Sequence, residues 1–194
     1  IDNKATASGS FVMHETNKTD GSNNYLFRPQ APSSFTSVNT NLFRIEAGKV
    51  AYWADGTMAL FNRSYSNAAS IYEDVRKIFS STENLSILHH DLKIAVEKRK
   101  QPIAGDTIWY DVTRLKAGKY TFELFFNQAD NWPLDVFFED AYAKSKVPVS
   151  LTAHSLVDVD VNSDSASFAS NRFRLVFEKS ASAPQPSIKL NAWQ

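Results

Sequence analysis

The sequence predicts an all-β protein, an antiparallel β-sandwich, and three observations lead to this prediction. Apolar and polar residues alternate with a period of two along most of the chain, as in strands with one buried and one solvated face. Turn-forming residues recur between these stretches at the spacing of about 8–12 residues that is typical of sandwiches. Finally, 43% of the residues are hydrophobic and 13% are aromatic, a composition suited to a core of Phe, Tyr and Trp.

The alternation marks the expected strands in chain order. In each stretch one row of apolar side chains would face the core, and the alternate row would face water. Turn signals such as ADGT (54–57), AGD (104–106) and KAGK (116–119) lie between the stretches. The expected core rows are Phe43 and Ile45; Leu92, Ile94 and Val96; Ile108, Tyr110 and Val112; Tyr120, Phe122, Leu124 and Phe126; Val157, Val159 and Val161; and Phe173, Leu175 and Phe177.

One segment departs from the strand pattern. Within 66–79, the apolar residues Ile71, Val75 and Ile78 recur at helical spacing, and a Ser-Asn pair at the start is available as an N-cap. We therefore predict one short helix near 66–79, lying across a sheet or its end.

The polar stretch 80–84 suggests a boundary between two halves. Residues 1–84 would form a strand-rich first half that carries the short helix. Residues 85–179 hold about seven expected strands, near the number in an immunoglobulin-like β-sandwich. After the regular strand that ends near residue 179, residues 180–194 contain two prolines and predict a linker followed by the start of another strand.

Charge and composition exclude several classes of function. Lysine plus arginine equals aspartate plus glutamate at 21 each, so the chain offers no basic field for nucleic acid. Cysteine is absent, which excludes disulfides, thiolate nucleophiles and cysteine metal sites. No apolar run approaches the ~20 residues of a membrane-spanning helix, so no membrane insertion is expected.

The segment DVDVNSDS (158–165) is the clearest candidate metal site, because oxygen-bearing side chains occur at every second position, as in calcium loops. An EF-hand, however, would have glycine in place of Ser163 and a bidentate Glu in place of Ala169. The alternative, which the poor record of isolated motifs favours, is a strand whose valines face the core and whose aspartates face water. The candidate calcium ligands are Asp158, Asp160, Asn162 and Asp164.

Two tryptophans are candidates for ligand binding. Trp132 follows Asn131 in a polar loop between two expected strands, and Trp53 lies near the ADGT turn. Exposed rings stack on sugar faces while neighbouring amides and carboxylates bond hydroxyls, so either ring could form a glycan site. The alternative is that Trp132 folds back to close the end of the core, with Pro133 fixing the start of the next strand.

Catalytic motifs are missing from the sequence. His89 and His90 are neighbours on an expected strand and would point to opposite faces. The same argument separates Glu139 from Asp140, which makes them a poor pair for glycoside hydrolysis. The motifs GxSxG, HExxH and GxGxxG do not occur, so we expect the chain not to be an enzyme.

Most of the chain, from about residue 10 to 179, resembles a β-sandwich module of large Bacteroidetes surface and secreted proteins. These include gliding-motility adhesins and other substrates of the type nine secretion system, in which the module lies ahead of the sorting domain. The family's GxYTF strand is kept at 118–122 and its apolar-x-ED strand at 137–140, but AYAKSK replaces the threonine usual after the acidic pair. The matching stretches are DGTMALFNRSYSNAASIYEDVRKIF, ENLSI, GDTIWYDVTRLKAGKYTFEL, DVFFEDAYAKSKVPVSL and SNRFRLVFEKS.

The resemblance implies a protein that is secreted or displayed on the surface of a Gram-negative bacterium. The tail ASAPQPSIKLNAWQ (181–194) is similar to a proline linker and the first strand of a following, truncated immunoglobulin-like domain. Neighbouring domains of the same polypeptide would then be the main partners, with a glycan or another surface ligand as a further one.

Together these observations predict a non-enzymatic structural or adhesion module of an exported bacterial cell-surface protein. It would act as a spacer or scaffold with weak ligand binding on its loops. The alternative is a carbohydrate-binding module attached to a secreted polysaccharide-degrading enzyme, with Trp132 or Trp53 as the platform for the sugar.

Overall fold

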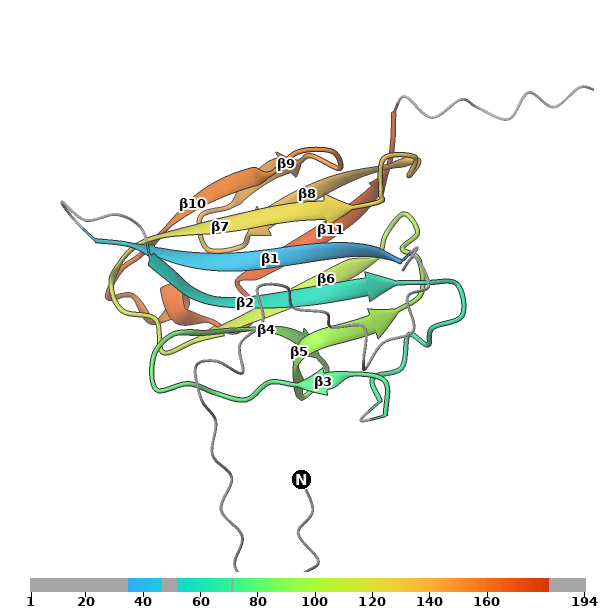
Figure 1. The fold of residues 1–194 in the computed structure, drawn as a ribbon. Coiled ribbons are helices and arrows are strands. Elements are labelled where there is room, and N and C mark those ends of the chain that lie inside the picture. The colour runs from blue at the N-terminus through green and yellow to red at the C-terminus, as the bar shows by residue number, and fades with distance from the viewer. Residues whose placement is uncertain (1–34, 47–51, 71, 182–194) are drawn as a thin grey trace, which may run out of the picture. The chain divides into compact units, whose positions relative to one another are not determined.

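The computed structural model describes residues 35–46, 52–70 and 72–181, and it confirms the all-β prediction (Figure 1). Apart from one 3₁₀ turn, the regular elements of these residues are strands. They are β1 (Thr36–Ile45), β2 (Tyr52–Phe61), β3 (Val75–Arg76), β4 (Asn84–His89), β5 (Leu92–Arg99), β6 (Thr107–Thr113), β7 (Gly118–Asn127), β8 (Leu134–Asp140), β9 (Ser145–Val149), β10 (Ser155–Val161), η3 (Ser165–Phe168) and β11 (Phe173–Lys179).

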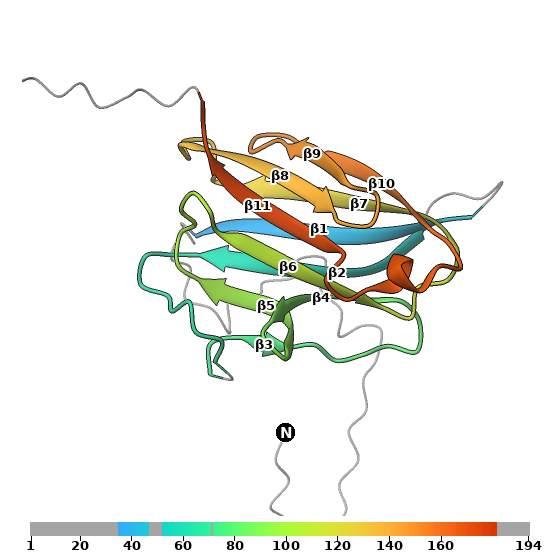
Figure 2. The same cartoon turned by 180° about the vertical axis from the view of Figure 1, so that it is seen from behind.

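The strands belong to one hydrogen-bonded sheet with the order β10-β7-β1-β2-β5-β4-β6-β11-β8-β9, and β3 pairs with β5 beside this path. Neighbouring strands are antiparallel except β2 and β5, which run parallel. The sheet folds back on itself, so that β7, β1 and β2 form a layer in front of β8, β11 and β6 (Figures 1 and 2).

The core lies between these two layers and is rich in aromatic rings. Phe122 of β7 contacts Phe138 of β8 and Phe173 of β11, with 4.8 Å between ring centroids in both pairs. Strands that are far apart in the sheet order therefore meet through their side chains, which is how two packed layers bury their apolar faces.

The predicted core rows of β6, β10 and β11 are confirmed, as is that of β7 up to Leu124. The row predicted for β1 is wrong: Val38 and Leu42 are buried, whereas Phe43 and Ile45 are only half-buried. In β5 only Ile94 of the predicted row is fully buried. Every inward residue of β10 and β11 is buried, and the residues between them are more exposed. This agreement has a simple cause: in a half-buried strand the face of each side chain is set by its parity.

The sheet does not divide at residues 80–84. β1 and β2, which precede this stretch, pair with β7 and β5, which follow it. The described residues belong to one compact unit, 34–194, so the strands of 85–179 share their sandwich with β1 and β2. Residues 1–33 and most of the expected linker and following strand (182–194) lie outside the described residues.

The short helix predicted near 66–79 is wrong. The described part of this segment consists of turns and β3, and Ile78, expected on the buried face, is 90% exposed. In place of helical hydrogen bonds, polar side chains of this segment form hydrogen bonds with backbone groups. Asp74 accepts from the backbone N–H of Lys98 in β5 at 2.7 Å, which holds the segment against the sheet in an extended form.

Among the described residues, no helix has the length and apolar character needed to cross a membrane.

Candidate functional site

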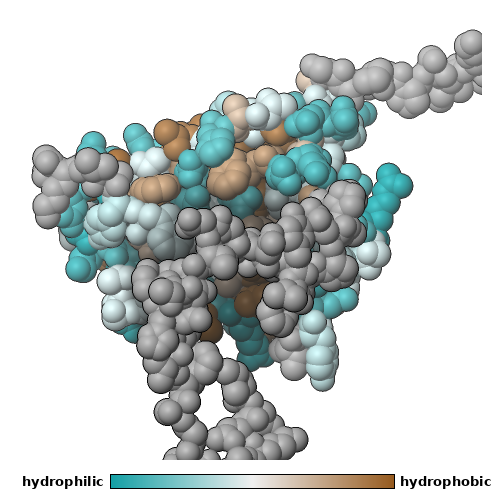
Figure 3. Space-filling view, in the orientation of Figure 1, coloured by the Kyte–Doolittle hydropathy of each residue, from teal (hydrophilic) through white to brown (hydrophobic). Residues whose placement is uncertain are grey.

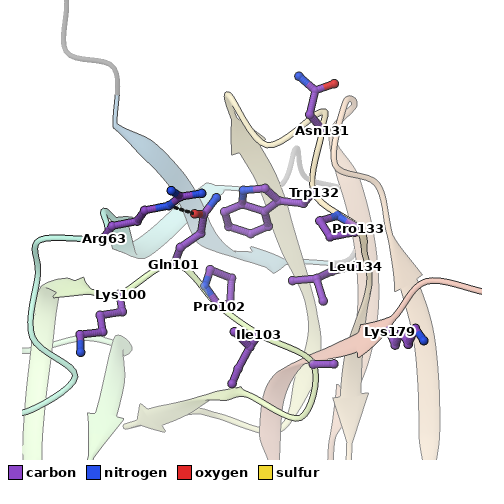
Figure 4. Close-up of a pocket in the computed structure, with 11 residues that line it drawn as sticks. Arg63, Lys100, Gln101, Pro102, Ile103, Asn131, Trp132, Pro133, Leu134 and Lys179 are labelled. Carbon is purple, nitrogen blue, oxygen red and sulfur yellow. Dashed lines mark hydrogen bonds between the residues drawn. The ribbon is translucent and has the colours of Figure 1, made fainter. Parts of the chain in front are cut away.

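A pocket of about 750 Å³ opens at the end of the sandwich where Trp132 lies, and we call it the Trp132 pocket (Figure 4). Its walls come from the loop after β2, the loop between β5 and β6, the loop between β7 and β8, and the ends of β8 and β11. Binding sites are often built from loops that a rigid sheet holds in place, and this volume lies in the range of small-molecule pockets.

Trp132 closes this end of the core, as the alternative interpretation of the sequence proposed. Its ring contacts Phe61 (5.2 Å between centroids), Phe126 (5.8 Å) and Phe177 (6.1 Å), all near edge-on. The ring also lines the pocket. Trp132 therefore contributes to the core and to the pocket wall together, and the two interpretations do not exclude each other.

The indole N–H of Trp132 is buried and has no hydrogen-bond partner in the described part of the chain. A buried donor without a partner costs roughly 1–3 kcal/mol. Packing in the core alone therefore does not explain why a tryptophan occupies position 132.

The floor of the Trp132 pocket is apolar and its rim is basic. Pro102, Leu134 and Ile103 form the floor, and Ile103 is 69% exposed. Arg63 Nε donates a hydrogen bond to Gln101 Oε1 at 3.4 Å across the rim (Figure 4). The described residues that line the pocket include no aspartate or glutamate.

The other two ligand-binding candidates differ in position. Asn131 lines the pocket but is exposed, and its side chain points away from Trp132 in Figure 4. Trp53 is 58% exposed and lies at the other end of β2 from Phe61. Its Nε1 donates to Asn41 Oδ1 at 3.4 Å. Trp53 is thus outside the pocket.

The ADGT stretch beside Trp53 is not a turn but part of β2. A Cβ atom on Gly56 would lie 2.8 Å from Asn41 Oδ1. A larger residue here would therefore require the Asn41 side chain to move, whereas the nearest backbone atom of β1, the Thr40 carbonyl oxygen, lies 3.5 Å away at ordinary contact distance.

Three of the four candidate calcium ligands serve local structure through their side chains, and the fourth, Asp160, does so through its backbone carbonyl oxygen, which accepts from Arg172. Asp158 and Asp160 lie on the outer face of β10, and Asp158 Oδ1 accepts from the hydroxyl of Thr121 at 2.7 Å. Asp164 is the N-cap of η3, and Asn162 donates to a tyrosine hydroxyl. The described residues contain no group of three or more His, Cys, Asp or Glu side chains placed to hold a metal ion.

The histidines lie differently from the expectation. His90 has a φ of 51° in the turn after β4, so its ring meets that of His89 at 5.0 Å instead of pointing away. His89 Nδ1 lies 2.9 Å from Glu97 Oε1, and Arg99 Nη1 lies 3.4 Å from Glu97 Oε2. Sequence reasoning missed this cluster, because Glu97 looked like one more charge at a strand end although it is 3% exposed.

The His89–Glu97 cluster borders a second pocket of about 520 Å³, between the β4–β5 turn and β6. An imidazole oriented by a carboxylate can act as a base when a nucleophile lies beside it. Within the described ranges, no hydrogen bond joins a serine or threonine hydroxyl to His89 or His90. His154 is remote from them: it pairs with Glu123 at 2.8 Å and stacks on Phe125.

Glu139 and Asp140 face opposite sides of β8, as their adjacency predicts. Glu139 accepts from Arg174 Nε at 2.6 Å on the outer face. Asp140 is buried and pairs with Arg172. The two carboxyl groups therefore do not flank a common site.

No known protein family, curated protein or solved structure matches this chain. The resemblance to the Bacteroidetes surface modules stays a prediction.

Proposed function

We propose that this chain is a non-enzymatic structural module of an exported bacterial cell-surface protein, acting as a spacer or scaffold between neighbouring domains. The observation that carries the proposal is the use of reactive side chains as structural pairs. The carboxylate of Asp140 is paired in the core, the His154 imidazole pairs with Glu123, and three of the four candidate metal ligands cap or brace local structure.

The outer surface fits this role. On the face shown in Figure 3, hydrophilic and hydrophobic residues are interspersed over the coloured surface. A module that links domains needs rigidity and solubility more than a reaction site, and the two packed layers supply the rigidity.

An activity screen tests the non-enzymatic part of the proposal. The whole chain is incubated with chromogenic esters, phosphates and glycosides, and we expect no turnover above buffer. The matched control is a double variant, His89→Ala with Glu97→Gln, which removes the imidazole–carboxylate pair beside the second pocket. Turnover that disappears in this variant would overturn the proposal.

A carbohydrate-binding module is the second candidate function, and the Trp132 pocket favours it. The pocket combines an aromatic ring, an apolar floor and amide groups, which together suit the C–H face and the hydroxyls of a sugar. Affinity gels with a panel of soluble polysaccharides separate the candidates. Saturable retardation that is lost in Gln101→Ala supports sugar binding, whereas equal mobility in every gel supports the scaffold alone.

A further inference from the structure

We infer that the Trp132 pocket selects acidic saccharides, sugar units that carry a carboxylate or a sulfate. This inference rests on the carbohydrate-binding candidate and narrows its ligand class. It starts from a local imbalance of charge: the chain as a whole is neutral, with 21 basic and 21 acidic residues. Among the residues that the structure describes, however, the pocket lining contains three cations and no carboxylate.

The three cations come from separate parts of the chain. Arg63 lies in the loop after β2, Lys100 directly follows β5, and Lys179 ends β11. In Figure 4, Lys100 and Lys179 lie on either side of the apolar floor, while Arg63 lies beside Gln101. The fold thus brings three cationic residues from separate parts of the chain to the lining of one pocket.

These cations are available to a ligand. Several arginines and lysines elsewhere in the sheet form ion pairs, as Lys77 does with Asp55 at 2.5 Å and Lys93 with Asp111 at 2.6 Å. By contrast, no ion pair involving Arg63, Lys100 or Lys179 is formed within the part of the chain that the structure describes. Two acids lie close to the floor in the chain, and neither lines the pocket. Asp135, next to Leu134, accepts from the backbone N–H of Ala181 at 3.4 Å, and Asp106 accepts from that of Ile103 at 2.9 Å.

The remaining groups fit a sugar ring better than a bare ion. Pro102 and Ile103 offer an apolar surface to the C–H face of a pyranose, and the Trp132 ring adds an aromatic edge. An arginine matches the planar geometry of a carboxylate, and lysines attract sulfate or carboxylate as point charges. Because Gln101 Oε1 is directed to Arg63, its amide nitrogen is left to donate to a hydroxyl.

Binding to polygalacturonate, whose units carry a carboxylate, tests the inference against a neutral galactan of similar size. We expect calorimetry and affinity gels to show saturable binding to the acidic polymer and at least ~10-fold weaker binding to the neutral one, since a charge-assisted hydrogen bond is roughly twice as strong as a neutral one. A double variant, Lys100→Gln with Lys179→Gln, should lose ~10-fold or more. Sulfated dextran distinguishes sulfate from carboxylate as the preferred anion.

The matched control is Lys119→Gln with Lys144→Gln, two exposed lysines outside the pocket, which change the net charge equally. Equal losses in the two double variants would show general charge attraction and overturn the inference. Equal binding to acidic and neutral polymers would overturn the anion selectivity but leave the carbohydrate-binding candidate. No binding to either polymer would overturn both and leave the scaffold.

Discussion

Asp140 and Arg172 form a buried, two-pronged ion pair that joins the end of β8 to the residue before β11. Arg172 Nε donates to Asp140 Oδ1 at 2.8 Å and Nη2 donates to Oδ2 at 2.6 Å. The side chains are 2% and 1% exposed. The same guanidinium also donates to the carbonyl oxygens of Ser167 and Asp160, so one side chain connects β8, η3, β10 and β11.

Breaking this pair should destabilise the protein strongly. Asp140→Asn removes the charge and one acceptor but leaves Arg172 buried, and an uncompensated buried charge costs about 3–5 kcal/mol. We expect urea unfolding to show a loss of that size. Arg174→Gln is the matched control, because its pair with Glu139 is partly exposed and should be worth at most ~1 kcal/mol. Similar losses in the two variants would contradict the prediction.

Calcium should not stabilise the fold through 158–165. Asp158 is engaged by Thr121 and Asp164 by the start of η3, so a cation would have to displace existing bonds. A site that binds only the folded form raises the melting temperature once free ion exceeds its Kd. We expect melting curves in millimolar calcium and in chelator to coincide. A reproducible rise that is absent in Asp158→Asn would show that the segment binds calcium.

Alkaline pH should unfold the protein through its buried tyrosines. Burial, with the nearby charge of Glu83 adding to it, raises the pKa of Tyr120 to about 12. Burial also raises the pKa of Tyr110, which shares a 2.8 Å hydrogen bond with Thr40. When folding raises the pKa of a tyrosine, the folded protein has its full stability at pH values below 10, the pKa in the unfolded chain. This stability is lost as the pH rises through the pKa of the folded protein.

We therefore expect the free energy of unfolding to fall between pH 10 and about 12, as followed by urea titration and tyrosinate absorbance. Tyr110→Phe should flatten part of this decline, although it leaves Thr40 without its partner at a cost of about 1–3 kcal/mol. The double variant Tyr110→Phe with Thr40→Val removes both hydroxyl groups, and it should regain part of the stability that Tyr110→Phe alone loses. An unchanged alkaline profile in Tyr110→Phe would show that Tyr110 does not contribute.

Much of the fold could be predicted because strand parity is a local property. Phe173, Leu175 and Phe177 alternate without interruption, and the structure buries all three. Strand pairing is not local: β1 lies between β2 and β7 because of contacts about 80 residues apart in the chain, and no short pattern encodes such a neighbour. The wrong prediction of a helix at 66–79 has the same origin. The hydrogen bond between Asp74 and β5 joins residues far apart in the chain, and the spacing of apolar residues within the segment gives no sign of it.

The candidate site could also be predicted only in part from the sequence. Trp132 could be found because a large aromatic residue in the polar loop 127–133 stands out from the alternation of the neighbouring strands. Arg63, Lys100 and Lys179 could not be found as a group, because each is an ordinary surface charge until the sheet brings three loops together. The contact between His89 and His90 was missed because it depends on a positive φ in the turn, which the strand assumption excluded.

Acid should weaken the protein through Glu83. Burial alone would raise the pKa of this carboxyl group, but hydrogen bonds from its own backbone, Tyr120 and Arg44 prevail and lower it below the ordinary 4.5. A lowered acid pKa gives stability that is present above the unfolded value and is lost as pH falls through the folded value. Glu83→Gln should therefore be less stable than the parent at pH 7, and this difference should shrink as the pH falls below 4.5. A constant difference across this range would contradict the prediction.

Asp74 should hold the 66–79 segment in place in solution. Its Oδ2 accepts from the N–H of Ser70 at 2.8 Å and its Oδ1 from that of Lys98 at 2.7 Å, so Asp74→Ala frees two backbone donors. We expect hydrogen exchange at these two amides to accelerate at least ~10-fold and the free energy of unfolding to fall by about 1–3 kcal/mol. Asp91→Ala, in the exposed β4–β5 turn, should change neither by a comparable amount. If Asp74→Ala instead raised the helical signal in circular dichroism, the carboxylate would be what prevents the helix that the spacing predicts. If exchange at Lys98 stayed slow, the bond to β5 would not be the anchor.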